Sequence, residues 1–426
     1  MRSRRSQHWR PLDNAAKIFP ANSTSRDSKV FRFSCELTEP VDAAALQSAL
    51  DRTLERFPLY RSVLKRGAFW YYLEHSGLKA EARPESLPPC DPLYRHEQRT
   101  LLFRVQYYRC RISLEVYHVL ADGTGALQFL CTLVYYYLLE KHPEAFPVPP
   151  ELPYGASRFQ EQADSFQKYY EKPAFSWKSR AGSAYQLRGE RLPKRRLAVI
   201  EGRLCLPEVL GCAQSMGLTL TELMTAVLIR AIHEEMRVWD RRRPVAISIP
   251  VNLRSYFPSA SIRNFFATIT VSYDFSNQAD NLEAVAAHVK REFRENLTEE
   301  RLRARMNELC SLEHSLPLRL VPLPVKDLIL RGAGCLESRR STASFSNVGR
   351  VSMPEAMERY IRLFSVFTSP NVLQACACSF GDHYVVSFSG VLVNRDVERA
   401  FFSTLAGLGL DVTVVTNRVH ADETDE

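Results

Sequence analysis

The first third of the chain carries apolar residues at helical and at strand spacing. In residues 41–57 they recur every three or four positions, which predicts an amphipathic helix. Aromatic residues in segments 69–73 and 101–108 alternate with polar ones and predict strands. Residues 110–118 alternate most regularly, so a strand with one buried face is expected there.

The strand predicted at 110–118 leads through a turn at 121–125 into a long apolar helix that is expected to begin near Ala126. The turn sequence Ala-Asp-Gly-Thr-Gly favours a tight connection, because glycine accepts unusual dihedrals and close backbone approach. The face expected to be buried carries Cys110, Ile112, Leu114, Val116 and His118.

Proline and polar residues mark a boundary near the middle of the chain. Segment 142–153 contains five prolines, and segment 178–196 is polar and basic. Neither composition is typical of regular structure. We therefore divide the chain into an N-terminal half (1–170), a crossover linker (171–196) and a C-terminal half (197–426).

The C-terminal half begins with a helix opened by the capping-box residues Thr219 and Glu222. Further helices are expected at 282–296 and 396–408. Strands are expected at 245–250, 268–275, 342–346, 361–367, 374–380 and 384–393. Helices and strands alternate in both halves, which predicts an α/β or α+β pair of domains.

The two halves contain one similar segment each. Residues 118–133 align without gaps on residues 390–405 with five identical positions, and both segments are predicted as strand, turn and helix. So short a match also fits chance or a shared amphipathic pattern. We interpret it as one topology used twice, with His118 in the first copy only.

The composition is that of a folded protein and excludes a disordered or fibrous one, since 45% of the 426 residues are hydrophobic and 24% are charged. The net charge of +8 is mild and gives no case for nucleic-acid binding. The longest apolar stretch, 126–139, is too short to span a bilayer, and no signal-peptide core follows the basic N-terminus. The ten cysteines form no CxxC pair. We expect a cytoplasmic monomer with reduced cysteines.

His118 is the candidate catalytic residue. At the end of a buried strand its imidazole is desolvated, which favours the neutral base near pH 7. Asp122 is placed to cap the following helix or to pair with a distant cation, and Gly123 suits the turn. A histidine in such a place is more often structural, and Asp-Gly is a common turn, so both interpretations stay open on local evidence.

The pattern H-x-x-x-D-G formed by His118, Asp122 and Gly123 resembles the signature of the condensation-domain and CoA-dependent acyltransferase superfamily. Other segments are similar to this family in chain order: 58–61 after the first helix, 250–254 ending in Arg254, 264–266 beginning with Asn264, and 346–349 beginning with Ser346 and Asn347. The doubled histidine and the DFGWG element found in parts of the family are absent. The chain is most similar to bacterial alcohol acetyltransferase-like and polyketide-associated acyltransferases.

The resemblance implies an α/β (two-layer α+β) protein of two chloramphenicol acetyltransferase-like domains, arranged as a V-shaped pseudo-dimer around a central tunnel. It implies that His118 is the general base and that Asp122 and Arg254 form a structural ion pair. The implied oxyanion donors are the Gly123 amide, Ser346 and Asn347, with Asn264 as a supporting residue.

The implied activity is acyl transfer from an acyl-CoA thioester to a hydroxyl or amine acceptor, as in alcohol O-acetyltransferases. Acyl-CoA is the expected co-substrate, and no permanently bound cofactor or metal is expected. Arginines at 241–243 and 188–196 are candidates to attract CoA phosphates or an acidic carrier protein, although a solvated surface is the commoner role.

Three alternatives remain beside this interpretation. The donor would be a thioester bound to an acyl carrier protein, or the chain would be a non-catalytic docking module of the same fold. The third is a peripheral membrane protein, for which Arg2, Arg4, Arg5 and Arg10 are the only sequence evidence. No stable membrane insertion is expected.

Overall fold

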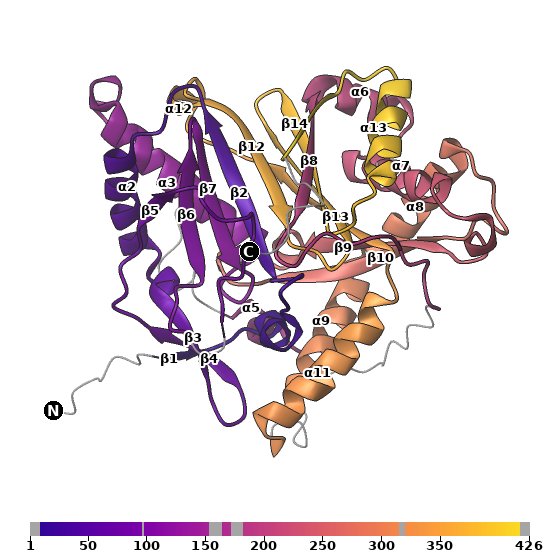
Figure 1. Cartoon of the computed structure of the whole chain (residues 1–426), viewed down its shortest axis with the longest axis horizontal. Helices are drawn as coiled ribbons and strands as arrows, with labels where there is room; N and C mark the ends of the chain where they lie inside the picture. The colour runs from indigo at the N-terminus through magenta and orange to yellow at the C-terminus, as the bar shows by residue number, and fades with distance from the viewer. Residues whose placement is uncertain (1–8, 96–97, 153–163, 172–181, 315–319, 418–426) are drawn as a thin grey trace.

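The computed structural model describes residues 9–95, 98–152, 164–171, 182–314 and 320–417 (Figure 1). Within these ranges the strands form a five-stranded, a seven-stranded and a three-stranded sheet. Helices pack on the two larger sheets, and the two α/β units lie side by side (Figure 1). The predicted two-domain α/β architecture is confirmed.

The N-terminal sheet has the strand order β12-β2-β7-β6-β5. Its helices α2 (Ala43–Arg56) and α3 (Gly123–Lys141) pack against each other and against this sheet. Its strands are β2 (Val30–Leu37), β5 (Ala82–Pro84), β6 (Phe103–Tyr108), β7 (Arg111–Tyr117) and β12 (Ile361–Thr368).

Strand β7 is buried on both faces, whereas its alternating sequence predicts one buried face. Glu115, on the polar face, is fully buried. Its carboxylate accepts hydrogen bonds from Arg32 Nε (3.0 Å) and Nη2 (2.7 Å), and from Arg104 Nη1 (3.1 Å). Because these charges pair with one another, a polar sequence face is compatible with burial.

Strand β12 belongs to the sheet of the first half although it comes late in the chain. It pairs antiparallel with β2, from Ile361 opposite Leu37 to Thr368 opposite Phe31. The second half therefore supplies an edge strand to the first. The limits 1–170 and 197–426 stay predictions. Of the predicted linker, residues 172–181 lie outside the described ranges, and the remainder contains an isolated bridge from Arg191 to Leu392.

The seven-stranded sheet has the order β10-β9-β11-β13-β14-β8-β15 and is covered by α6, α7, α8 and α13. The capping box that opens α7 is confirmed, since Glu222 accepts from the Thr219 amide at 2.7 Å. The helices are α6 (Leu206–Ser215), α7 (Leu220–Glu234), α8 (Leu282–Asn296) and α13 (Asp396–Gly407). The strands are β8 (Ala198–Cys205), β9 (Val245–Asn252), β10 (Phe266–Tyr273), β11 (Ala343–Arg350), β13 (Leu373–Phe380), β14 (His383–Gly390) and β15 (Thr413–Thr416).

The similarity between the halves extends to their elements. Strand β7 leads within six residues into α3, and strand β14 leads within six residues into α13. Both segments are thus strand, turn and helix, as predicted. His118 in the first copy corresponds to Gly390 in the second.

Two long helices and most of a small sheet were not predicted, since only its strand at 71–75 overlaps the strand predicted at 69–73. Helices α9 (Glu299–His314) and α11 (Leu323–Ser338) lie between β10 and β11 in sequence and project below the two halves (Figure 1). The small sheet joins β1 (Trp9–Pro11), β4 (Tyr71–His75) and β3 (Ser62–Arg66). Shorter elements include η1 (Ala15–Ile18), α1 (Phe19–Asn22), η2 (Pro58–Arg61), η3 (Pro143–Ala145), α5 (Ser165–Tyr169), η4 (Val238–Asp240), η5 (Leu253–Ser255) and α12 (Glu355–Glu358).

Among the described residues, no single helix has the length and apolar character needed to cross a membrane. The pair α6 and α7, bent by 80°, passes that test of length and composition only when the two helices are taken together. The ten cysteines, which all lie within the described ranges, form no disulfide bond.

Candidate active site

His118 lies directly after β7, at the junction of the two halves. Its backbone amide donates to Lys29 O at 2.9 Å. Its ring stacks on Phe19 with 4.6 Å between centroids, meets Phe31 edge-on at 5.0 Å, and contacts Phe266 of β10 at 5.6 Å. The first and second halves of the chain thus both contribute to its surroundings.

The aromatic surroundings determine the charge of the imidazole. Burial lowers the pKa of His118, and the opposing effects of the Asp122 carboxylate and the Asn264 side chain do not restore it. The neutral ring is therefore favoured at neutral pH, which agrees with the expectation from its place at the strand end.

Asn264 determines which imidazole nitrogen carries the proton. Its Nδ2 donates to His118 O at 3.0 Å and to Asp13 Oδ2 at 3.1 Å. With the amide nitrogen facing these acceptors, Oδ1 faces His118 Nδ1 at 2.9 Å and must accept. Nδ1 therefore holds the proton, and Nε2 keeps the lone pair that a base needs.

The structure contains the predicted ion pair, with Arg254 Nη1 2.7 Å from Asp122 Oδ2. The same carboxylate accepts from the Phe265 amide at 2.9 Å, and its other oxygen caps α3 by accepting from the Gly125 amide at 3.0 Å. Asp122 thus joins the start of α3 to segment 261–265 of the second half.

Arg254 holds the same segment from its other side. Its Nε and Nη2 donate to Ser261 O at 3.0 and 2.8 Å, and Nη2 donates to Arg263 O at 2.6 Å. Asn264 lies in this segment, so Arg254 fixes the backbone that carries the histidine's partner. Arg254 is a positioning residue in this arrangement.

The glycine that the turn requires is Gly125. A Cβ atom there would lie 1.9 Å from Ile262 O, so segment 261–265 could not approach α3 as it does. At Gly123 a Cβ atom would lie 3.8 Å from Phe33 Cζ, an ordinary contact, and its φ is outside the left-handed region. Gly123 is the first residue of α3, which begins three residues before the predicted Ala126. The oxyanion role of its amide stays a prediction.

Ser346 and Asn347, the other predicted oxyanion donors, lie on β11. Asn347 Nδ2 donates to Thr221 at 3.0 Å, and its Oδ1 accepts from the Gly349 amide at 3.0 Å. Within the described ranges, no hydrogen bond joins either residue to His118. Their part in an oxyanion site stays a prediction.

Asp13 is a site residue that sequence reasoning missed. It is fully buried, accepts from Ala16 N at 2.8 Å and lies 3.5 Å from Arg263 Nε. It also accepts from Asn264 and so completes the chain of contacts to His118. An Asp-Asn pair before an apolar turn is a capping signal, but it follows a basic segment that gave no reason to expect burial.

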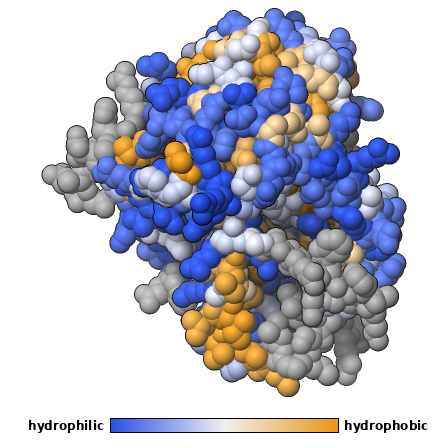
Figure 2. Space-filling view, turned by 90° about the vertical axis from the view of Figure 1, so that its right-hand side faces the viewer, coloured by the Kyte–Doolittle hydropathy of each residue, from blue (hydrophilic) through white to orange (hydrophobic). Residues whose placement is uncertain are grey.

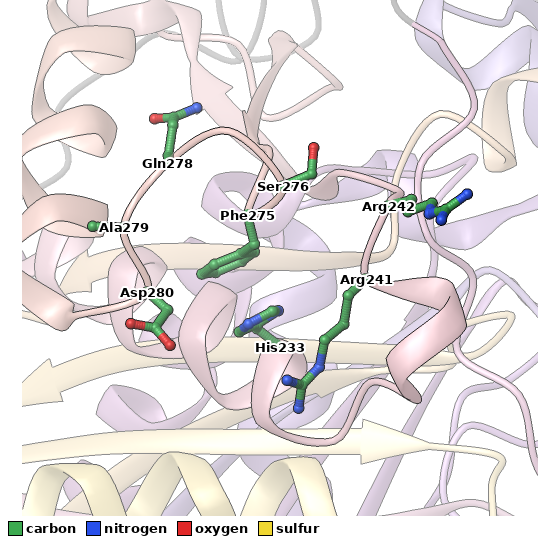
Figure 3. A pocket seen from close by; sticks show the side chains of 8 residues that line it. All are labelled: His233, Arg241, Arg242, Phe275, Ser276, Gln278, Ala279 and Asp280. Atoms are coloured by element: carbon green, nitrogen blue, oxygen red, sulfur yellow. The ribbon is translucent and has the colours of Figure 1, made fainter.

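The cavity in Figure 3 lies away from this site. It has a volume of about 410 Å³ and is lined by the end of α7, by Arg241 and Arg242, and by the loop 275–280. Phe266, at the start of β10, contacts His118, whereas the cavity lies beyond the last residue of β10. With about 3.3 Å per strand residue, most of this eight-residue strand separates the two.

No family model and no curated protein matches the sequence. Solved structures do match its fold. Polyketide synthase associated protein 5 from Mycobacterium tuberculosis has a TM-score of 0.57 at 16% identity, covering 93% of this chain and 97% of the other. TRI3 trichothecene 15-O-acetyltransferase from Fusarium sporotrichioides has 0.63 at 11%, covering 94% of each. A starter condensation domain of rhizomide synthetase RzmA, solved with C8-CoA, has 0.59 at 12%, also covering 94% of each.

The chain therefore has the two-domain fold shared by condensation domains and acetyltransferases. This is the fold of the superfamily that the sequence pattern resembles. At such low identity the likeness concerns the fold alone.

Replacing Gly125 tests the contact between α3 and segment 261–265. We expect Gly125→Ala to lower the free energy of unfolding by about 1–3 kcal/mol, because the methyl group overlaps a backbone carbonyl. Gly123→Ala is the matched control and should leave stability unchanged or slightly raised. Chemical denaturation measures both. Equal stability of the two variants would contradict the account.

Proposed function

We propose that the protein is an acyltransferase that moves an acyl group from acyl-CoA to a hydroxyl or amine acceptor. The observation that carries this proposal is the orientation of His118 by Asn264, which leaves the lone pair on Nε2. A neutral, desolvated and oriented imidazole is what general-base catalysis requires. The shared fold of acetyltransferases and condensation domains supports it.

The proposed reaction uses one base and no acyl-enzyme intermediate. His118 Nε2 accepts the proton of the acceptor hydroxyl while its oxygen attacks the thioester carbonyl carbon. The tetrahedral intermediate collapses with cleavage of the carbon–sulfur bond, and the proton passes from Nε2 to the leaving sulfur. The products are an ester and free CoA thiol, with the histidine neutral again.

The proposed acyl donor is an acyl-CoA. C8-CoA bound to the starter condensation domain supports an acyl-CoA donor, since that domain has this fold. A thioester on a carrier protein would serve the same chemistry. The hydrogen bond that orients His118 toward Asn264 leaves a lone pair on Nε2, which a base needs, and this favours an enzyme over a non-catalytic docking module.

His118→Ala tests the catalytic assignment. Wild-type protein should release thiol from at least one member of an acyl-CoA panel when a mixture of alcohols and amines is present. The variant should lower kcat/KM by about 10²–10⁴ because it lacks the base. His383→Ala, an exposed histidine, is the control. A fully active His118→Ala variant would remove the proposed base. If the wild-type protein turns over carrier-bound thioesters but no acyl-CoA, the proposed donor would be a carrier-bound thioester instead.

The pH dependence tests the environment of His118. As the pH falls, the imidazole is protonated and loses its lone pair, so kcat/KM should fall on the acid side. Since burial lowers the pKa of His118, the midpoint should lie below that of an exposed histidine. Asn264→Ala removes a contact that raises this pKa, so the midpoint should move lower still. We expect its kcat to drop about 10- to 100-fold through lost orientation. An unchanged midpoint and kcat would contradict the role of Asn264.

A further inference from the structure

Helix α11 leaves an apolar face uncovered at one end of the molecule. Leu328 is 70% exposed and Leu336 is 65% exposed, and Leu320 just before the helix is 73% exposed. Val325 and Ile329 are about half exposed. Figure 2 shows a concentrated apolar area at the lower end of the molecule, where α11 lies in Figure 1.

The exposed apolar residues form one face of the helix. Counted from Val325, the next positions are three, four and eleven residues on, at Leu328, Ile329 and Leu336. This spacing places them on a continuous stripe, with Gly332 between the two ends. We name the surface made by these four apolar residues and Leu320 the α11 face.

The rest of α11 is anchored, so the α11 face cannot turn inward. Lys326 is fully buried, and its Nζ donates to Phe69 O at 2.8 Å. Asp327 accepts from Tyr71 at 2.9 Å, and Arg331 Nε donates to Ala21 O at 2.9 Å. The helix is thus fixed to the β3–β4 hairpin and to α1.

An exposed aromatic ring and basic side chains border the α11 face. The β3–β4 hairpin, whose Ala68 carbonyl accepts from the Leu323 amide at 2.9 Å, carries Phe69, which is 46% exposed. Arg339 and Arg340 follow the helix and are exposed, and Arg340 Nη1 also pairs with Glu337 Oε2 at 3.0 Å.

We propose that the α11 face binds to an anionic lipid membrane, with the helix lying in the plane of the interface. An apolar stripe bordered by an aromatic ring and by arginines is typical of helices that bind there. A second copy of the chain is the other candidate occupant. Its basic border would repel the same border here, and the face lies on a projecting end of the molecule (Figure 1).

This binding goes beyond the proposed acyl transfer and does not depend on it, since His118 takes no part. Its consequence is that the protein is concentrated at a surface where apolar acyl groups and alcohols are dissolved. The predicted absence of stable membrane insertion is compatible with it, because an interfacial helix does not span the bilayer.

Vesicle co-sedimentation of the full chain tests the proposal. Vesicles of phosphatidylcholine with phosphatidylglycerol should bind the protein, and vesicles of phosphatidylcholine alone should bind it less. Leu328→Ser with Leu336→Ser should reduce the bound-to-free ratio about tenfold or more, because two apolar side chains are lost from the face that enters the membrane. Val148→Ser with Val238→Ser, two exposed aliphatic positions elsewhere, should bind as the wild type does.

If the Leu328/Leu336 serine variant does not fold, a charge variant still tests the proposal. Arg339→Glu with Arg340→Glu should weaken binding to the anionic vesicles and leave the apolar face intact. Wild-type protein that binds neither kind of vesicle would overturn the proposal. Binding equal to that of the wild type by the folded Leu328/Leu336 variant or by the Arg339/Arg340 variant would also overturn it. If the wild type is a dimer and the Leu328/Leu336 serine variant is a monomer, the α11 face would instead bind a second copy of the chain.

Discussion

The ion pair between Asp122 and Arg254 is the interaction on which the site depends. Their side chains are only 6% and 11% exposed, and they come from opposite halves of the chain. Burying two charges is unfavourable unless their remaining hydrogen-bonding atoms are also satisfied. Here the carboxylate also accepts from two backbone amides, and the guanidinium donates to backbone carbonyls of segment 261–265. The pair therefore determines the path of the backbone around it.

The effect of this pair reaches His118 through Asn264. The backbone held by Arg254 carries Asn264, and the Asn264 amide is held in turn by Asp13 and by the His118 carbonyl. The Asn264 oxygen Oδ1 is thereby fixed opposite His118 Nδ1 and accepts a hydrogen bond from it. His118, the proposed base in the first half, is thus oriented by residues of the second half. Strand β12 connects the halves further, since it completes the sheet that contains β7.

Sequence patterns predicted the elements with strong periodicity and the residues of the H-x-x-x-D-G turn. They did not predict that β7 is buried on both faces, because the pairing of Glu115 with Arg32 and Arg104 joins three strands. They assigned the special turn to Gly123, whereas the close approach occurs at Gly125 and depends on Ile262, far away in sequence. Helix α11 was also missed, because its polar residues Lys326 and Asp327 are buried while its apolar residues Leu328 and Leu336 are exposed, the reverse of the usual pattern. Local sequence patterns predict local structure, whereas these features depend on contacts between segments that are distant in the sequence.

The tautomer of His118 is the most direct test of this account. Nitrogen-15 chemical shifts of the imidazole, measured at neutral pH in the wild type and in Arg254→Gln, report which nitrogen is protonated. We expect the proton on Nδ1 and an unprotonated Nε2 in the wild type, and a mixture of tautomers in a folded Arg254→Gln variant. A proton on Nε2 in the wild type, or an unchanged tautomer in the folded variant, would contradict the claim that the ion pair orients His118.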